Sequence, residues 1–195
     1  MIRRAAACVI LLLGAGCASL PPAGDPGGWP ARRLELQSLP SWTLDGRVAV
    51  ATRSEGFSGG LAWRQHGAQA EIELRGPLGG TALAIRVDGA TFSVTDGSGE
   101  SVAGDAAREL VANEIGAALP VLELRYWLVG VPAPGLPYRE TIGIDGRLAG
   151  LAQAGWQMRY QRYDVVGEMV LPARMEMESG DVRLRVAVAN WRLAP

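Results

Sequence analysis

Apolar and polar residues alternate along most of this chain from Trp42 onward. The series with an apolar residue at every second position cover residues 44–50, 68–74, 83–87, 92–94, 156–160 and 182–188. A period of two places apolar side chains on one face of a strand, which is typical of an antiparallel sheet with one solvated face. Glycine-containing turn signals separate the series, at Gly67, Asp88-Gly89, Asp96-Gly97, Asp145-Gly146, Ala154-Gly155 and Ser179-Gly180. The pattern predicts a mainly β fold of about nine to eleven strands.

A helical insertion interrupts the strands between residues 105 and 130. Asp105 is a favourable N-cap, and the apolar stripe that follows it comprises Val111, Ile115 and Ala118. Pro120 ends this helix or starts a second one over residues 122–129, with Gly130 at its C-terminus. We therefore expect five strands, two helices and further strands, with the helices packed on, or plugging, the apolar face of the curved sheet.

The first seventeen residues run from basic through apolar to small, and end at Cys17. Arg3 and Arg4 precede an apolar core of 9 to 11 residues, which is shorter than the ~20 needed to span a bilayer. This order predicts a secretory signal peptide over residues 1–16. Cys17 after small residues resembles a bacterial lipoprotein signal, in which the cysteine receives a diacylglycerol, although Gly14 stands where the usual pattern has leucine. The alternative is a soluble secreted protein cleaved nearby.

Residues 17–41 are predicted to be the lipidated cysteine followed by a flexible tether. Prolines and glycines are frequent there and disfavour regular structure; they are Pro21, Pro22, Gly24, Pro26, Gly27, Gly28 and Pro30. The folded domain is then expected to cover residues 42–195.

Composition removes several classes of function. All 19 basic residues are arginines, and without Arg3 and Arg4 the chain holds 17 basic and 20 acidic residues, a net charge of −3. This balance gives no support for nucleic-acid binding. Cys17 is the only cysteine after the signal and His66 is the only histidine, which removes an internal disulfide, most zinc sites and most Ser-His chemistry. We expect a non-enzyme, without cofactor or metal apart from the lipid on Cys17.

Two motif-like stretches are better explained as structure. Gly56-Phe57-Ser58-Gly59-Gly60 fits the G-x-S-x-G pattern, but it bridges two predicted antiparallel strands, whereas a nucleophile elbow needs a strand–turn–helix. His66 is expected to be a solvated turn residue. Residues 96–100 lack the ligand number and spacing of a calcium loop, so a hairpin tip is the better interpretation.

Leu78 occupies the most exposed position of the turn Gly76-Pro77-Leu78-Gly79-Gly80. Either it folds back onto the core, or it forms an apolar tip that contacts a membrane or a partner. The turn has no lysine of a phosphate-binding loop, so a nucleotide role is not expected.

Large apolar residues on the predicted strands and helices could have either of two roles, lining a cavity or packing the core. The candidates for lining an acyl-chain cavity are Trp42, Trp63, Trp127, Trp156 and Met158. The same residues could simply pack the core, which is the usual role of aromatic residues in strands.

Several motifs, in order, resemble the LolB family of outer-membrane lipoproteins. They are Trp42 with Gly46-Arg47-Val48-Ala49-Val50, Pro77-Leu78-Gly79, Arg125-Tyr126-Trp127-Leu128-Val129-Gly130-Val131-Pro132, Trp156 with Tyr160 and Tyr163-Asp164, Leu171-Pro172-Ala173, and Asn190-Trp191. The resemblance implies an unclosed antiparallel β-barrel whose helices cover an apolar cavity.

The same resemblance implies a function and a role for Leu78. The chain would be a monomeric receptor, held by lipid on the periplasmic face of the outer membrane. It would accept acylated lipoproteins from the periplasmic carrier LolA and insert them into that membrane. Leu78 matches the leucine that performs the insertion step in the family. The alternative function is a structural or assembly lipoprotein whose concave face binds a protein partner.

Overall fold

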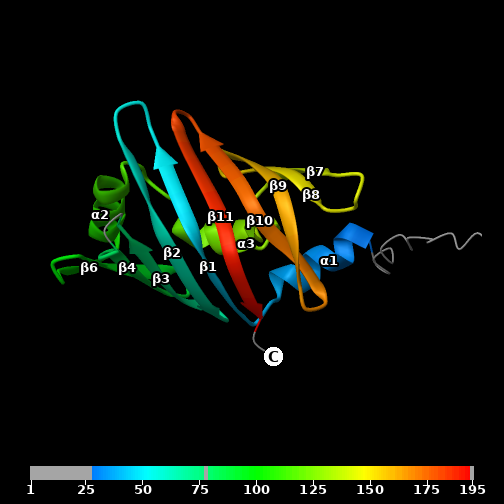
Figure 1. The fold of residues 1–195 in the computed structure, drawn as a ribbon, viewed down its shortest axis with the longest axis horizontal. Coiled ribbons are helices and arrows are strands. Elements are labelled where there is room, and N and C mark those ends of the chain that lie inside the picture. Colours follow the sequence, from blue (N-terminus) through cyan, green and yellow to red (C-terminus); the bar gives the residue numbers. More distant parts are fainter. Residues whose placement is uncertain (1–27, 77–78, 194–195) are drawn as a thin grey trace, which may run out of the picture.

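The computed structural model describes residues 28–76 and 79–193, and shows one open antiparallel sheet with three helices (Figure 1). The strands follow the order β6-β5-β4-β3-β2-β1-β11-β10-β9-β8-β7, so the two edges, β6 and β7, do not pair with each other. The first six strands are β1 (Ser41–Ala51), β2 (Gly56–His66), β3 (Gln69–Arg75), β4 (Thr81–Asp88), β5 (Thr91–Asp96) and β6 (Ser101–Ala103). The others are β7 (Tyr138–Ile142), β8 (Leu148–Gln153), β9 (Trp156–Val166), β10 (Met169–Ser179) and β11 (Val182–Leu193). The prediction of an unclosed, mainly β fold is confirmed.

The predicted alternation decides which face of the sheet is buried. On β4, for example, Leu83, Ile85 and Val87 are buried, while the residues between them are partly or fully exposed. Five of the six predicted turns contain a glycine with a positive φ; at Asp96-Gly97 the positive φ belongs instead to Gly99. Six strands, rather than the expected five, precede the helices, because the short β6 follows the turn at residues 97–100. The alternation gave no sign of β6, which has only three residues.

Two helices cover the apolar face of the sheet. Helix α2 (Asp105–Ile115) ends at Gly116, which has a left-handed φ of 80°, and α3 (Val121–Leu128) follows after a short connection. Two details of the prediction are wrong. Asp105 is the first helical residue and Gly104 is the N-cap, so the carboxylate acts on the helix dipole from the first turn. Ala118 lies beyond the helix and is exposed, because Gly116 ends α2 before the stripe reaches it.

Helix α1 (Gly28–Gln37) corrects the predicted tether. Pro30 is the third residue of the helix, and a proline in the first turn removes no hydrogen bond, because those N–H groups have no partner within the helix. Good helix formers follow it as far as Gln37. The helix is fixed by Leu36, which is buried, by Arg32, which donates to the Val170 carbonyl at 2.5 Å, and by Gln37, which donates to the Pro132 carbonyl at 2.8 Å. Ordered structure therefore begins at least fourteen residues before Trp42.

None of the helices in the described part of the chain has both the length and the apolar content to cross a membrane.

Candidate functional site

An apolar cavity of about 40 Å³ lies between the buried face of the sheet and the two covering helices. Every residue that lines it is apolar. The sheet contributes Val48, Val50, Phe57, Leu61, Trp63, Ile72, Leu74, Ile85, Leu184 and Val186, and the helices with their connection contribute Ile115, Leu119, Val121, Leu124 and Leu128. The cavity therefore lies between the central strands β11, β1, β2, β3 and β4 on one side and the α2–α3 region on the other.

Helix α3 is held over the sheet by a buried hydrogen-bond network centred on Gln153. The Trp127 indole N–H and the Ala133 backbone N–H donate to Gln153 Oε1 at 2.8 Å and 2.7 Å, and Gln153 Nε2 donates to the Ala133 carbonyl at 2.8 Å. The hydroxyl of Tyr160 donates to the Trp127 carbonyl at 2.9 Å. Burial raises the pKa of Tyr160 well above its usual value, so the hydroxyl remains a donor over the ordinary pH range. These bonds join α3 to β8 and β9.

Helix α2 is attached in a different way. Its buried residues are Ala107, Val111 and Ile115, and the guanidinium of Arg108 lies 5.6 Å from the centre of the Phe92 ring on β5. Within the described ranges, the side-chain hydrogen bond made by α2 joins Arg108 to Asp105 inside the helix, at 3.1 Å. Among the residues that the structure describes, apolar contacts and one cation–π contact thus hold α2 to the sheet, without the directional bonds that fix α3.

The five predicted cavity residues fall into two groups. Trp63 lines the cavity and stacks against Trp42, with ring centroids 5.8 Å apart; Trp42 in turn contacts Trp191 edge-on at 5.3 Å. Trp127 and Trp156 lie 6.3 Å apart, and both belong, with Met158, to the buried core. The structure thus brings Trp63 to the cavity wall, and places the other four in the surrounding core.

The other two predicted site residues, Cys17 and Leu78, lie outside the described residues, as does the signal segment 1–16. The turn that contains Leu78 has a hydrogen-bonded base, since Gly76 N donates to the Gly80 carbonyl at 2.9 Å. On either side of it, Glu73 accepts hydrogen bonds from Arg75 and Thr81 at 2.7 Å and 2.9 Å. These bonds, led by the one from Arg75, lower the pKa of Glu73.

The serine and the histidine do not form a catalytic pair. Residues 56–60 are all in β2, so the prediction that they bridge two strands is wrong. Ser58 and His66 lie eight residues apart on β2, about 26 Å at the rise of a strand. His66 ends β2, and its Nδ1 is 2.8 Å from Ser41 Oγ. Asp96 accepts hydrogen bonds from the N–H groups of Ser98 and Glu100, and in the described part of the chain no cluster of three potential metal ligands occurs.

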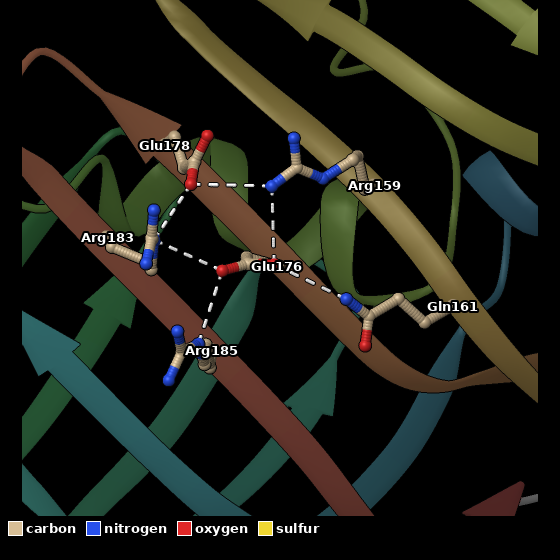
Figure 2. Close-up of polar contacts among 6 residues, drawn as sticks. All are labelled: Arg159, Gln161, Glu176, Glu178, Arg183 and Arg185. Carbon is tan, nitrogen blue, oxygen red and sulfur yellow. Dashed lines mark hydrogen bonds and ion pairs between the residues drawn. The ribbon is translucent and has the colours of Figure 1, made fainter.

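Charged side chains gather on the opposite, outward face of β9, β10 and β11 (Figure 2). Glu176, only 13% exposed, lies at their centre and accepts from Arg185 at 3.2 Å and from Arg159 and Gln161 at 3.3 Å. Arg183 is 2.8 Å from Glu178 and 3.2 Å from Glu176. Burial pushes the pKa of Glu176 up, but the hydrogen bonds and charges of Arg185 and Arg159 outweigh it, so the pKa is lowered.

Replacing Glu176 by glutamine is expected to change how stability depends on pH. The folded-state pKa lies below the ordinary value of 4.5, so the charged form stabilises the fold above pH 4.5. This contribution is lost as the pH falls through the lowered pKa. In urea unfolding at several pH values, Glu176→Gln should therefore be less stable than the wild type at pH 7, and the difference should shrink below pH 4.5. A difference that stays constant down to pH 3 would contradict the assignment.

The open antiparallel sheet with helices on one face defines the class of fold, and solved structures agree. A LolA-superfamily protein from Nitrosomonas europaea superposes with a TM-score of 0.54 at 13% identity, covering 86% of this chain and 94% of that protein. The fold is therefore similar to that of this LolA-superfamily protein.

Sequence comparison gives the family within this class. The profile described as outer membrane lipoprotein LolB matches residues 40–191. The outer-membrane lipoprotein LolB of Nitrosococcus oceani is 36% identical over 188 residues, covering 94% of both chains. That of Halorhodospira halophila is 37% identical over 194 residues, covering 97% of this chain and 94% of the relative. The chain belongs to the LolB family, and is accordingly an outer-membrane lipoprotein with a role in lipoprotein transport.

Sequence reasoning missed Gln153, the polar centre of the α3 attachment. A signal for it was present: Gln153 ends the short apolar segment 148–153 and lies three residues before Trp156. A buried glutamine at an inward-facing position needs partners for both its donor and its acceptor groups. The missing information was the position of Trp127 and Ala133, which a strand pattern does not contain.

Proposed function

We propose that this protein is the receptor that takes acylated lipoproteins from a periplasmic carrier of the LolA kind and inserts them into the outer membrane. The observation that carries the proposal is the wholly apolar cavity between the sheet and α2–α3. Acyl chains offer neither hydrogen bonds nor charge, so a site for them needs apolar area and no polar group. A surface for a folded protein partner would instead carry a polar rim and hydrogen bonds.

Binding of acyl chains requires the cavity to open. A dry cavity of about 150 Å³ holds a single benzene, and the cavity here measures about 40 Å³. Helix α2 and residues 116–120 are the parts that move, because α3 is fixed to Gln153 and Tyr160 by buried hydrogen bonds. Acyl chains replace the apolar contacts that α2 gives up, at about 0.8 kcal/mol per buried CH₂.

Transfer then proceeds through differences in affinity between successive apolar environments. The order is carrier, cavity and bilayer. Lipid on Cys17 holds the receptor at the membrane, which raises the effective concentration of the accepting bilayer. Leu78, on the glycine-rich turn between β3 and β4, contacts the bilayer during insertion. A single chain suffices for these steps.

Leu78→Glu tests the insertion step. A charge on this turn opposes entry into lipid but leaves the cavity residues unchanged. Vesicles that carry the anchored protein are supplied with carrier loaded with an acylated lipoprotein, and cargo on the receptor and cargo in the bilayer are measured separately. We expect cargo to accumulate on the variant and insertion to be lost. Leu78→Met, which keeps the apolar character, is the control and should insert normally.

Two outcomes would refute parts of the proposal. Normal insertion by Leu78→Glu would remove Leu78 from the mechanism. Absence of cargo from the wild-type receptor, together with failure to bind an apolar fluorescent probe, would remove the acyl-chain site and leave the assembly lipoprotein as the better explanation.

A further inference from the structure

The turn between β7 and β8 exposes an isoleucine completely. Ile144 has a relative exposure of 111% and lies in Gly143-Ile144-Asp145-Gly146. The turn is well defined, since Gly143 N donates to the Arg147 carbonyl at 2.7 Å and Gly146 N donates to the Gly143 carbonyl at 3.0 Å. Turn positions of this kind favour Asn, Asp, Gly and Ser. A β-branched apolar residue at this position departs from the usual turn residues, and its fully exposed side chain gains no packing contacts that would offset this.

Other exposed apolar residues lie on the adjacent elements. Of the six large apolar side chains that are most exposed in the described residues, five lie on α1, on β7 or beside β7; they are Leu34, Leu136, Tyr138, Ile142 and Ile144. Helix α1 touches β7 directly, because Arg33 donates to the Tyr138 hydroxyl at 2.5 Å. In Figure 1 the start of α1 and the β7–β8 turn lie at the same end of the molecule. We call Ile142 and Ile144 the apolar end; the exposed Leu34 lies on the neighbouring helix α1.

The charges around the apolar end are largely compensated. Arg33 lies 3.6 Å from Glu140, and Asp145 lies 3.2 Å from Arg147. Paired charges approach an interface at lower cost than isolated ones, since each partner replaces part of the lost hydration. Arg139, exposed on β7, adds a cation next to the apolar end, and a cation near a membrane surface favours anionic headgroups.

The position of the lipid anchor identifies the occupant of this surface. Ten residues separate Cys17 from Gly28, the first residue of α1, so the two Cα atoms are at most about 40 Å apart in any conformation. The start of α1 therefore stays within about 40 Å of the lipidated cysteine. From this we infer that the apolar end, with Ile144 at its tip, docks on the lipid surface of the membrane that anchors the chain. The inference rests on the proposed anchoring through Cys17.

This contact is separate from the proposed insertion step. Leu78 belongs to the turn between β3 and β4, whereas Ile144 belongs to the turn between β7 and β8, and five strands separate these two hairpins in the sheet. The docking contact would orient the receptor, and the turn with Leu78 would act on cargo.

A site-specific probe tests the docking in the complete, lipid-anchored protein. Cys17 carries the lipid and Cys8 leaves with the signal, so Ile144→Cys introduces a single reactive thiol. An environment-sensitive dye on this thiol is measured in vesicles of phosphatidylethanolamine and phosphatidylglycerol that contain nitroxide-labelled lipids. Val165→Cys is the matched control, since Val165 is also apolar and 77% exposed but lies on β9. We expect a blue shift and several-fold stronger quenching at position 144 than at position 165.

Each outcome has one meaning. Equal, water-like signals at positions 144 and 165 in protein that floats with the vesicles would overturn the docking. A signal at 144 that changes only when a carrier protein is added would also overturn it, in favour of a protein contact. Protein that does not float with vesicles would refute the anchoring, and docking with it. Loss of cargo transfer with a normal signal at 144 would refute the proposed function alone.

Discussion

Trp127→Ala is expected to lower the free energy of unfolding by about 4 kcal/mol, the usual cost of removing a large buried aromatic side chain. Trp127 is 0% exposed, packs against Trp156, and donates its indole N–H to Gln153 at 2.8 Å. The substitution leaves a void beneath α3 and removes one of the bonds that fix this helix. Urea unfolding followed by far-ultraviolet circular dichroism measures the change.

Trp127→Phe separates the two contributions. Phenylalanine keeps most of the apolar volume but donates no hydrogen bond, so it should cost about 1–3 kcal/mol through the incompletely satisfied Gln153. Gln153→Leu should resemble it, or be worse, because Trp127 and Ala133 both lose a buried partner. A Trp127→Phe variant as unstable as Trp127→Ala would show that the hydrogen bond, rather than the packing, dominates.

The difference between α2 and α3 links stability to the proposed function. A cavity that opens for acyl chains needs one wall that moves and one that keeps its place. Helix α3 has buried polar bonds to β8 and β9, whose loss is expensive. Helix α2 has apolar contacts, which an acyl chain can replace with little net loss. Substitutions at Gln153 should therefore mainly lower stability, whereas those at Ile115, which lines the cavity, should also change cargo binding.

The parts of the fold that could be predicted are those that depend on the local periodicity of apolar residues. Alternation identified the buried face of β4, β5 and β11, and glycines marked the turns. The proline and glycine content of residues 17–41 hides helix α1, because the decisive feature is the position of Pro30 in the first helical turn. The apolar stripe extends α2 as far as Ala118, beyond its true end, because the stripe does not show that Gly116 ends the helix in a left-handed conformation.

The candidate site was less accessible from the sequence. Which tryptophan lines the cavity depends on the strand order, which brings β11 next to β1 and so places Leu184 and Val186 beside Val50 and Val48, in the cavity that Trp63 also lines. Long-range pairing of this kind leaves no trace in a local pattern. The sequence also offers no reason to single out Ile144, because one apolar residue in a turn suggests a contact site only when its exposure and its neighbours are known.

Gly59→Ala should also be strongly destabilising, and it tests why β2 is rich in glycine. A Cβ at Gly59 would lie 1.9 Å from the Arg75 carbonyl oxygen on β3, so the backbones of the two strands would have to separate. We expect a loss of at least about 2 kcal/mol, as for other overpacked positions, and weaker binding of an apolar probe, because Phe57 and Leu61 on the same strand line the cavity.

Gly60→Ala is the matched control for this effect. A Cβ at Gly60 would meet the Arg75 side chain at 3.4 Å, an ordinary contact, so the stability of the Gly60→Ala variant should stay within about 0.5 kcal/mol of the wild type.

Ser58→Ala, which removes the hydroxyl of the G-x-S-x-G pattern, should likewise leave stability and probe binding unchanged. If Gly59→Ala were as stable as Gly60→Ala, close approach of β2 and β3 would not explain the glycine. If only Ser58→Ala lost cargo transfer, the pattern would have a chemical role after all. The expected ranking makes Gly59, rather than Gly60, the glycine that close packing of β2 against β3 requires.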